Sequence, residues 1–426
     1  MKVALINSSE LSGGAAIACN RLYQAHKAND VQVSLLVQTV NEPKIDQSIH
    51  KVHGNLPLSI HEKSTFYLEK LQFLPHEKDK RSRFAFSTGL FGRQIHRHPI
   101  VQEADVIHLH WINKGFVSLR GLQNLIALNK PIVWTMHDMW PITGGCHYSD
   151  ECTNYKMQCG NCMMLRKSGK NDLSNKIWFK KNNAFQQTDV LQFVACSEWL
   201  ASICRNSSMG RDHAVTSIPN CIDIEKYKSL TTSLNLSKIN ILFQAMNIED
   251  ERKGFHFFLE SLKVLKALDP GLSKKITVNV IGKANPADQI SKLGYKVNYS
   301  GLLKKEADIV SAYQKAHLYI IPSLQDNLPN TVMEALSCSV PVVGFNTGGI
   351  PEMVKHLHNG YIASRKDSLQ LAKGILWSLN NPEHYATLRR HARESVEQKY
   401  SYKSVSNQYV SIYKNLLTSN REKSFL

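Results

Sequence analysis

The segment Ile320–Val343 reads IIPSLQDNLPNTVMEALSCSVPVV, and it decides the fold class of this chain. It opens with a short apolar run typical of a buried β-strand, which ends near Pro322. Asn330 is a good helix cap, so a helix is expected to begin at Thr331, and the run Pro341–Gly344 is expected to be the next strand. A strand, a helix and a strand in close succession are typical of parallel α/β sheets.

The same alternation of strand-length apolar runs and helical segments extends over the whole chain. A chain of 426 residues is too long for one ordinary core, and the series restarts after Ile218–Asp223, where Pro219 and Asn220 break the pattern. We therefore expect two doubly wound α/β domains, over residues 1–218 and 219–398. The predicted strands are Leu318–Ile321, Pro341–Gly344, Val3–Ile6, Val33–Val37, Val106–His110, Ile132–Met136, Phe193–Ala195, Ile241–Gln244 and Thr277–Ile281.

The formal net charge of +17 indicates an anionic partner, which could be nucleic acid, an acidic membrane surface or a phosphorylated substrate. The stretch Lys63–Arg97 interleaves basic and aromatic residues, which fits either a solvated helical face or a patch on a membrane surface. No recognised nucleic-acid motif accompanies the charge, so we expect no nucleic acid as partner.

No apolar run approaches the ~20 residues of a membrane span, and no hydrophobic leader follows the first strand. An odd number of cysteines, nine, in a chain without a leader favours a reducing compartment. We expect a cytoplasmic protein, with peripheral attachment to the inner membrane left open.

Four cysteines, Cys146, Cys152, Cys159 and Cys162, follow one another as C-x5-C-x6-C-x2-C. Four thiols could supply the soft ligands of a closed, structural Zn²⁺ site, although the first spacing is wider than usual. Reduced buried thiols and two disulfides formed on oxidation are the alternatives, and the expected compartment disfavours disulfides.

Two segments carry residues suited to an activated, phosphorylated ligand. Gly13 and Gly14 follow the first strand and precede a helical segment, so the backbone there either binds phosphate or only makes a tight turn. Asp326 lies at the carboxyl end of a predicted strand, and Glu334 lies about one turn into the following helix. Open α/β sheets bind ligands at that edge, and two carboxylates suit sugar and ribose hydroxyls.

Asp326 is followed by seven residues, then by Glu334 and the run Ala-Leu-x-Cys-x-x-Pro-Val-Val. This pattern resembles the signature of the retaining glycosyltransferases of family four, which have the GT-B fold. Asp326 stands where the commoner motif has Glu. Further segments support the resemblance in the order the family requires: Ser12–Gly14, Trp134–Pro141, Ile218–Asp223, Arg252–Gly254 and Thr347–Glu352. The block Trp134–Cys162 most resembles bacterial exopolysaccharide transferases of the colanic-acid type.

The resemblance implies two Rossmann-like domains facing across a cleft, with a C-terminal helix over 399–426 crossing back to the first domain. It implies that Glu334 binds the nucleotide ribose, Asp326 binds a donor-sugar hydroxyl, Lys253 neutralises the departing diphosphate and His137 faces the sugar. The other implied donor- or phosphate-binding positions are Gly13, Gly14, Arg252, Asn327, Leu328, Asn330 and Thr331.

The second phosphate-binding cation departs from the family pattern. The family places an Arg just after a strand, where this chain has Gln244–Asn247. Arg252 is the available substitute. Neighbouring residues on a helix point in different directions, so the side chains of Arg252 and Lys253 are expected to diverge.

The implied reaction is transfer of a sugar from a nucleotide-sugar donor to a glycan or polyprenyl-linked saccharide, with retention of configuration and no cofactor for catalysis. A nucleotide-sugar epimerase of the same fold is the rival enzyme, and product analysis separates them because only a transferase releases nucleoside diphosphate.

Overall fold

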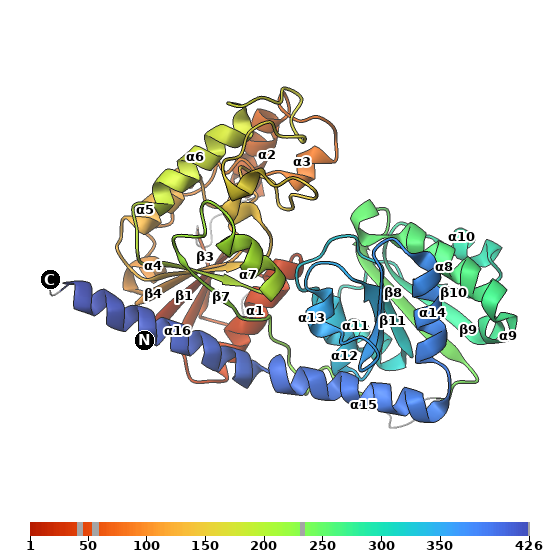
Figure 1. Cartoon of the computed structure of the whole chain (residues 1–426). Helices are drawn as coiled ribbons and strands as arrows, with labels where there is room; N and C mark the ends of the chain where they lie inside the picture. Colours follow the sequence, from red (N-terminus) through yellow and green to blue (C-terminus); the bar gives the residue numbers. More distant parts are fainter. Residues whose placement is uncertain (41–45, 53–58, 231–234, 425–426) are drawn as a thin grey trace. The chain divides into compact units, whose positions relative to one another are not determined.

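The computed structural model describes residues 1–40, 46–52, 59–230 and 235–424, apart from the side chains of residues 59–63 and 421–424. The chain divides into two compact units, Met1–Cys221 with Tyr402–Leu426, and Ile222–Ser401 (Figure 1). Each division lies three residues after the position expected from the sequence, 218 and 398 against 221 and 401. The segment Tyr402–Leu426 belongs to the first unit.

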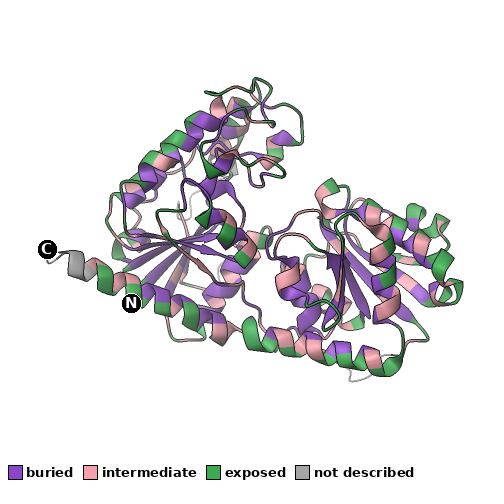
Figure 2. Cartoon of the chain, in the orientation of Figure 1, coloured by how far each residue is buried: buried purple, intermediate pink, exposed green. Residues whose placement is uncertain are grey.

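The first unit contains one parallel sheet in the order β3-β2-β1-β4-β5-β6-β7. Its central strands are buried on both faces, which explains their continuous apolar sequences (Figure 2). The strands are β1 (Lys2–Ser9), β2 (Gln32–Thr39), β3 (Ile49–Lys51), β4 (Val106–Leu109), β5 (Ile132–Met136), β6 (Leu191–Ala195) and β7 (Ala214–Ser217).

Successive residues of these strands enter different cores, because side chains alternate across a sheet. Leu5 packs in a core with residues of α1 and α16, whereas Ile6 packs in the core on the other face. The helices of this unit are α1 (Gly14–Lys27), α2 (Ser59–Phe73), α3 (Ser82–Ala85), α4 (Pro99–Glu103), α5 (Leu119–Ile126), α6 (Leu173–Phe185), α7 (Glu198–Arg205) and α16 (Tyr402–Ser424), with 3₁₀ turns η1 (Trp140–Ile142) and η2 (Asn154–Lys156).

The second unit contains a parallel sheet in the order β10-β9-β8-β11-β12-β13. Its strands are β8 (Ile239–Asn247), β9 (Ile276–Lys283), β10 (Lys296–Tyr299), β11 (Leu318–Ile321), β12 (Val342–Phe345) and β13 (Gly360–Ala363). Its helices are η3 (Glu251–Lys253), α8 (Phe255–Leu268), α9 (Pro270–Lys275), α10 (Ala287–Lys292), α11 (Glu306–Lys315), α12 (Asn330–Ser337), α13 (Ile350–Met353), α14 (Ser368–Ser378) and α15 (Pro382–Lys399).

The order of this sheet indicates where ligands usually bind in this type of fold. From β8 the chain moves outward to β9 and β10, and from β11 it moves outward in the opposite direction to β12 and β13. The neighbouring strands β8 and β11 therefore form a topological switch point, whose carboxyl ends are the usual ligand site of an open α/β sheet. No helix in the described part of the chain has the length and apolar character needed to span a membrane.

Candidate active site

The loops that follow β8 and β11 are joined by hydrogen bonds at the switch point of the second unit. The backbone N–H of Leu324 donates to the carbonyl of Arg252 at 2.8 Å, and Arg252 Nη1 donates to the carbonyl of Gln325 at 2.7 Å. These bonds hold the Arg252–Lys253 pair beside Asp326.

The local sequence explains why the chain turns sharply at this point. Asp250 caps η3 by accepting a hydrogen bond from Arg252 N at 3.0 Å, and the turn ends at Gly254 with a φ of 69°. A Cβ at Gly254 would lie 1.9 Å from the Pro322 carbonyl oxygen, so only glycine fits between the two loops.

Both cations converge on one carboxylate. Lys253 Nζ lies 2.6 Å from Asp326 Oδ2, and Arg252 Nη1 lies 3.6 Å from the same oxygen. The expectation that the side chains of Arg252 and Lys253 diverge is therefore wrong, because they lie on a 3₁₀ turn packed against the β11 loop. Burial raises the pKa of Asp326, but the charges of Lys253 and Arg252 outweigh it and hold the pKa below its usual value.

Helix α12 begins one residue earlier than predicted. It starts at Asn330, and Pro329 occupies the N-cap position with φ −66°, so Asn330 is the first helical residue and not the cap. No side chain caps this terminus. The N-terminus of a helix carries partial positive charge and exposes N–H groups, which suits a phosphate.

Glu334 and its neighbours lie in a closely packed region of the second unit. Glu334 is 5% exposed, and Asn327 and Leu328 are buried as well. Burial and the charge of Glu334 both raise the pKa of Tyr313, which shows that this tyrosine lies close to the carboxylate. Glu334 thus lies in the packed interior of the second unit, close to Tyr313.

Gly348 and Gly349 were absent from the predicted site, although Thr347–Glu352 supported the family resemblance. A Cβ at Gly348, which has a φ of 57°, would lie 1.6 Å from the Asp326 carbonyl oxygen. Gly349 N donates to the carbonyl of Asn327 at 2.8 Å. The glycine pair therefore supports the backbone of the Asp326 loop, and the Thr-Gly-Gly sequence was the signal for it.

A cavity of about 280 Å³ lies beside this site, where β8 and β9 end. It is lined by residues 248–251, Phe255, His256, 284–286 and Gln289. Its volume is close to the lower limit for small-molecule sites. Sequence reasoning missed it, because its lining comes from two separate loops.

In the first unit, Gly13 lies between β1 and α1, and Gly14 is the first residue of α1. Gly13 has a φ of 98° and is the N-cap of α1. A Cβ at Gly13 would meet no atom within 4 Å, so the space beside it is open. A positive φ and open space are compatible with backbone approach by a ligand, and a tight turn alone would explain only the positive φ.

His137 directly follows β5, at the carboxyl edge of the first sheet. Its Nε2 lies 3.0 Å from His110 Nδ1, and its Nδ1 lies 3.5 Å from Cys196 Sγ. Burial lowers the pKa of His137 to about 4, so the ring is neutral at physiological pH. Both ring nitrogens contact protein groups, and one contact must open before a ring nitrogen can bind a sugar.

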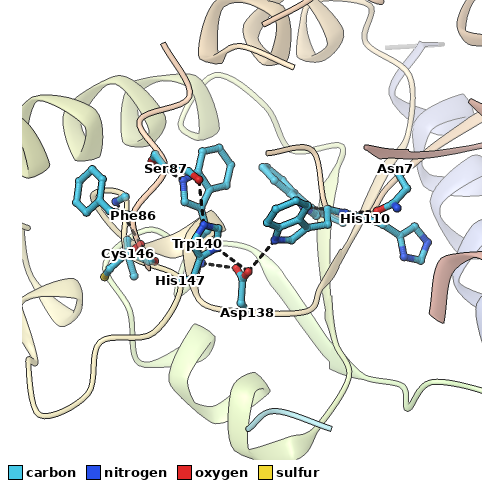
Figure 3. A network of polar contacts seen from close by, with 12 residues as sticks. Asn7, Phe86, Ser87, His110, Asp138, Trp140, Cys146 and His147 are labelled. Carbon is cyan, nitrogen blue, oxygen red and sulfur yellow. Dashed lines mark hydrogen bonds and ion pairs between the residues drawn. The ribbon is translucent and has the colours of Figure 1, made fainter. Parts of the chain in front are cut away.

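Asp138 is the centre of a hydrogen-bond network that sequence reasoning missed (Figure 3). Its Oδ2 accepts from Trp111 Nε1 at 2.8 Å and pairs with His147 Nδ1 at 2.7 Å. His147 Nε2 lies 3.0 Å from Ser87 Oγ, and Trp111 N donates to Asn7 Oδ1 at 2.9 Å.

This network joins strand β1 to the loops that follow β4 and β5. A row of serine, histidine and aspartate is also the catalytic triad of serine hydrolases. Ser87, however, is only 5% exposed. Here the hydrogen-bonded row orders the loop that carries His137. Burial raises the pKa of Asp138, but His147 and the other donors outweigh it, so the carboxyl remains ionised.

Lys181 is a second feature that the sequence did not reveal. Its side chain is fully buried, and its Nζ donates to the carbonyls of Trp140 at 2.5 Å and Thr143 at 3.0 Å. Burial lowers its pKa to about 7. It ties helix α6 to the η1 turn just after Asp138.

The four clustered cysteines lie near one another in the first unit. Burial and the neighbouring thiols of Cys159, Cys162 and Cys152 raise the pKa of Cys146. All four are free thiols. Their chemistry suits zinc, yet within the described residues no three His, Cys, Asp or Glu side chains are arranged to hold a metal ion. A zinc site would require this segment to close around the ion, and it stays a prediction.

Two family models match this protein, one over most of each unit. Residues 12–226 match the family model described as Glycosyltransferase Family 4, and residues 232–395 match the model described as Glycosyl transferases group 1. The colanic acid biosynthesis glycosyl transferase WcaC of Escherichia coli K12 is 25% identical over 359 residues, which are 78% of this chain and 82% of that protein.

Solved structures share the fold at low sequence identity. Sucrose-phosphate synthase from Thermosynechococcus elongatus has a TM-score of 0.66 at 16% identity and covers 98% of this chain and 99% of its own. Anabaena HepE, solved in complex with UDP-glucose, has a TM-score of 0.62 at 16% identity, with coverages of 97% and 100%. The predicted GT-B fold is confirmed.

Proposed function

The chain belongs to glycosyltransferase family 4, and from that premise we propose that it transfers a sugar with retention of configuration from a nucleotide-sugar donor to a glycan or lipid-linked saccharide. The proposed setting is the synthesis of a bacterial surface polysaccharide, because the relative WcaC is named for colanic acid biosynthesis. The observation that carries the proposal is the convergence of Lys253 and Arg252 on Asp326 at the switch point of the second sheet.

This arrangement suits a diphosphate leaving group. The two cations and the N-terminus of α12 supply positive charge where the departing phosphate becomes more negative, which stabilises the transition state more than the ground state. On donor binding, Lys253 exchanges its contact with Asp326 for the diphosphate. Asp326 is then released to accept a hydrogen bond from a hydroxyl of the donor sugar.

Glu334 is proposed to bind the ribose, because the oxygens of a buried carboxylate can accept hydrogen bonds from a pair of hydroxyl groups. No divalent metal is needed in this scheme, since protein cations and a helix terminus take its place. The departing phosphate itself accepts the proton of the acceptor hydroxyl, so no dedicated nucleophile is invoked.

Product analysis tests the proposal. Incubation of the purified protein with UDP-, GDP- or ADP-sugars and a saccharide acceptor, in the presence of EDTA, should release nucleoside diphosphate. The anomeric proton of the product, read by NMR, should keep the configuration of the donor. An inverted product would remove the retaining mechanism, and a returned nucleotide sugar would identify an epimerase.

We further propose that the α2–α3 surface binds an anionic membrane, where a lipid-linked acceptor would be found. Tyr67, Leu68, Leu71 and Leu74 are 44–63% exposed, and they recur at the spacing of one helical face. Phe84 is 72% exposed. The side chain of Lys63 lies outside the described residues, and Arg83 is paired with Glu77.

Basic residues adjoin this apolar surface. Lys78, Lys80 and Arg81 are exposed directly after α2, and with the net charge of +17 they favour anionic lipid. Exposed apolar side chains beside exposed cations are the composition of a surface that lies in a membrane interface. The stretch Lys63–Arg97 was interpreted as either a solvated helical face or a membrane-binding patch. The exposed apolar side chains support the membrane-binding patch.

A further inference from the structure

One ring nitrogen of His110 is buried without a partner. His110 is 3% exposed, and its Nε2 has no hydrogen-bond partner among the described residues. Its other nitrogen, Nδ1, lies 3.0 Å from His137 Nε2. A buried polar atom left without a hydrogen bond is unfavourable, so a binding partner for Nε2 is expected.

His110 also lines a small cavity within the first unit. The cavity has a volume of about 10 Å³, which is close to the space taken by one water molecule. Its lining includes Thr135, Asn220 and Tyr409 besides His110. A buried water usually makes about three hydrogen bonds, and this lining offers enough polar groups for them.

We propose that one water molecule is bound in this cavity, where it joins His110 to Tyr409 of helix α16 and makes Tyr409 a positioning residue for His137. The role in catalysis rests on the proposed function, in which His137 serves the transfer reaction. The water site itself does not depend on that function.

Tyr409 is itself held in a hydrogen-bonded chain that crosses the core. Its hydroxyl lies 2.9 Å from Thr135 Oγ1, and Thr135 Oγ1 lies 2.7 Å from His108 Nε2. His108 Nδ1 lies 2.6 Å from the hydroxyl of Tyr413, which lies 3.0 Å from His26 Nε2. Two residues of α16 thus bond to the first sheet, Tyr409 to Thr135 and Tyr413 to His108.

The positions of the protons in this series of hydrogen bonds depend on one another. Burial lowers the pKa values of His108 and His26, so each ring is neutral and carries one N–H. If His108 donates from Nδ1, Thr135 must donate to His108 and Tyr409 must donate to Thr135. If His108 donates from Nε2, Thr135 can donate to Tyr409, whose own proton then points to the water.

The orientation of the water therefore depends on which nitrogen of His108 carries the proton. The orientation of the water determines whether His110 Nε2 donates or accepts a hydrogen bond. The other nitrogen of His110, Nδ1, is hydrogen-bonded directly to His137. The docking of α16 is thereby linked to the tautomer and position of His137, with no contact between α16 and the ligand required.

A crystal structure at a resolution that shows ordered water tests the site directly. One density peak within hydrogen-bond distance of both His110 Nε2 and Tyr409 Oη is expected, and an empty cavity would overturn the proposal. This test uses the wild-type protein, so it does not depend on the folding of any variant.

The coupling is tested by NMR of protein labelled with ¹⁵N in its histidine rings. Tyr409→Phe should shift the ring nitrogens of His110 and His137, whereas Tyr23→Phe should not. Tyr23 is a matched control, because its buried hydroxyl bonds Asp46 and Ser48 in the same unit but outside this chain. Unchanged His110 and His137 signals in folded Tyr409→Phe would overturn the coupling.

Turnover adds a functional reading. In Tyr409→Phe we expect kcat to fall by about 2- to 10-fold, the equivalent of one hydrogen bond, with the donor Kd unchanged. If wild-type protein shows no transfer at all, the proposed function fails while the water and NMR tests still decide this inference. Wild-type turnover in Tyr409→Phe would contradict the positioning role.

Discussion

Lys253 and Asp326 form a close ion pair, with 2.6 Å between Nζ and Oδ2, at the edge of the sheet where the donor is expected to bind. The two residues come from loops that are separated by 73 positions in the chain. In this pair the carboxylate neutralises the cation that is assigned to the diphosphate. Under the proposed function, donor binding replaces this pair, and we expect the energetic cost to favour a highly charged ligand.

Glu334→Ala should weaken binding of the nucleotide sugar, because it removes the acceptor assigned to the ribose hydroxyls. A hydrogen bond to a charged group contributes about 1.5–3 kcal/mol, so Kd should rise by roughly 10- to 100-fold. Calorimetric titration with the donor measures this change. Glu352→Ala, a carboxylate of the neighbouring α13, is the control and should bind normally; equal affinity in both variants would refute the assignment of Glu334.

The first unit should lose stability as the pH falls below about 6.5. Burial holds the pKa of His26 at about 3 and that of His137 at about 4, and it keeps the pKa values of His108 and His110 well below normal. The unfolded chain takes up these protons below pH ~6.5 and the native state does not, so stability is full above that pH and falls towards pH 4.

Each of the four histidines contributes up to about 1.4 kcal/mol per pH unit in this range, so unfolding should require roughly 5 kcal/mol less at pH 5.5 than at pH 7.5. Urea unfolding followed by tryptophan fluorescence measures it, because Trp111, Trp134, Trp140, Trp178 and Trp199 all lie in the first unit. A midpoint that stays constant between these pH values would show that the histidines are not buried neutral groups.

Vesicle binding should depend on the basic residues after α2. Each Lys near an anionic surface contributes about 1 kcal/mol, so Lys78→Ser with Lys80→Ser should weaken binding to anionic vesicles by roughly 30-fold at low salt. The matched control is Lys274→Ser with Lys275→Ser, which removes two exposed charges from α9. Cosedimentation at two salt concentrations measures both. Equal losses in the two double variants would indicate a diffuse charge effect and no α2–α3 surface.

The cysteine segment should carry about one zinc ion per chain when the protein is purified without chelators. Cys159→Ser with Cys162→Ser should lose the metal and lower the thermal stability, since a closed four-ligand site contributes directly to folding. Cys204→Ser is the control, because Cys204 is buried in the same unit outside the segment. Metal-free wild-type protein with four titratable thiols at these positions would leave reduced, buried cysteines as the correct interpretation.

The sheets show which parts of a fold the sequence could predict. The nine predicted strands correspond to β1, β2, β4, β5, β6, β8, β9, β11 and β12. The missed strands are β3, β7, β10 and β13, which are the edge strands of the two sheets. Central strands are buried on both faces and need continuous apolar runs, whereas an edge strand such as Lys296–Tyr299 alternates between exposed and half-buried residues.

The candidate site was predictable only where a motif carried it. The spacing of Asp326 and Glu334 identified the carboxylates, and Lys253 followed from the family resemblance. The convergence of Arg252 on Asp326 depends on a 3₁₀ turn, and the Asp138 network joins residues up to 104 positions apart. Such long-range contacts leave no periodicity in the sequence, because each partner has an ordinary local environment.

The most direct measurement of the central claim is turnover of the nucleotide-sugar donor by Lys253→Met beside Lys263→Met, an exposed lysine of α8 that pairs only with Glu260 in the described contacts. Release of nucleoside diphosphate should fall by roughly 10²-fold or more in Lys253→Met, as for removal of one transition-state donor, and should be unchanged in Lys263→Met. Circular dichroism confirms that both variants fold. Wild-type turnover in a folded Lys253→Met protein would contradict the account.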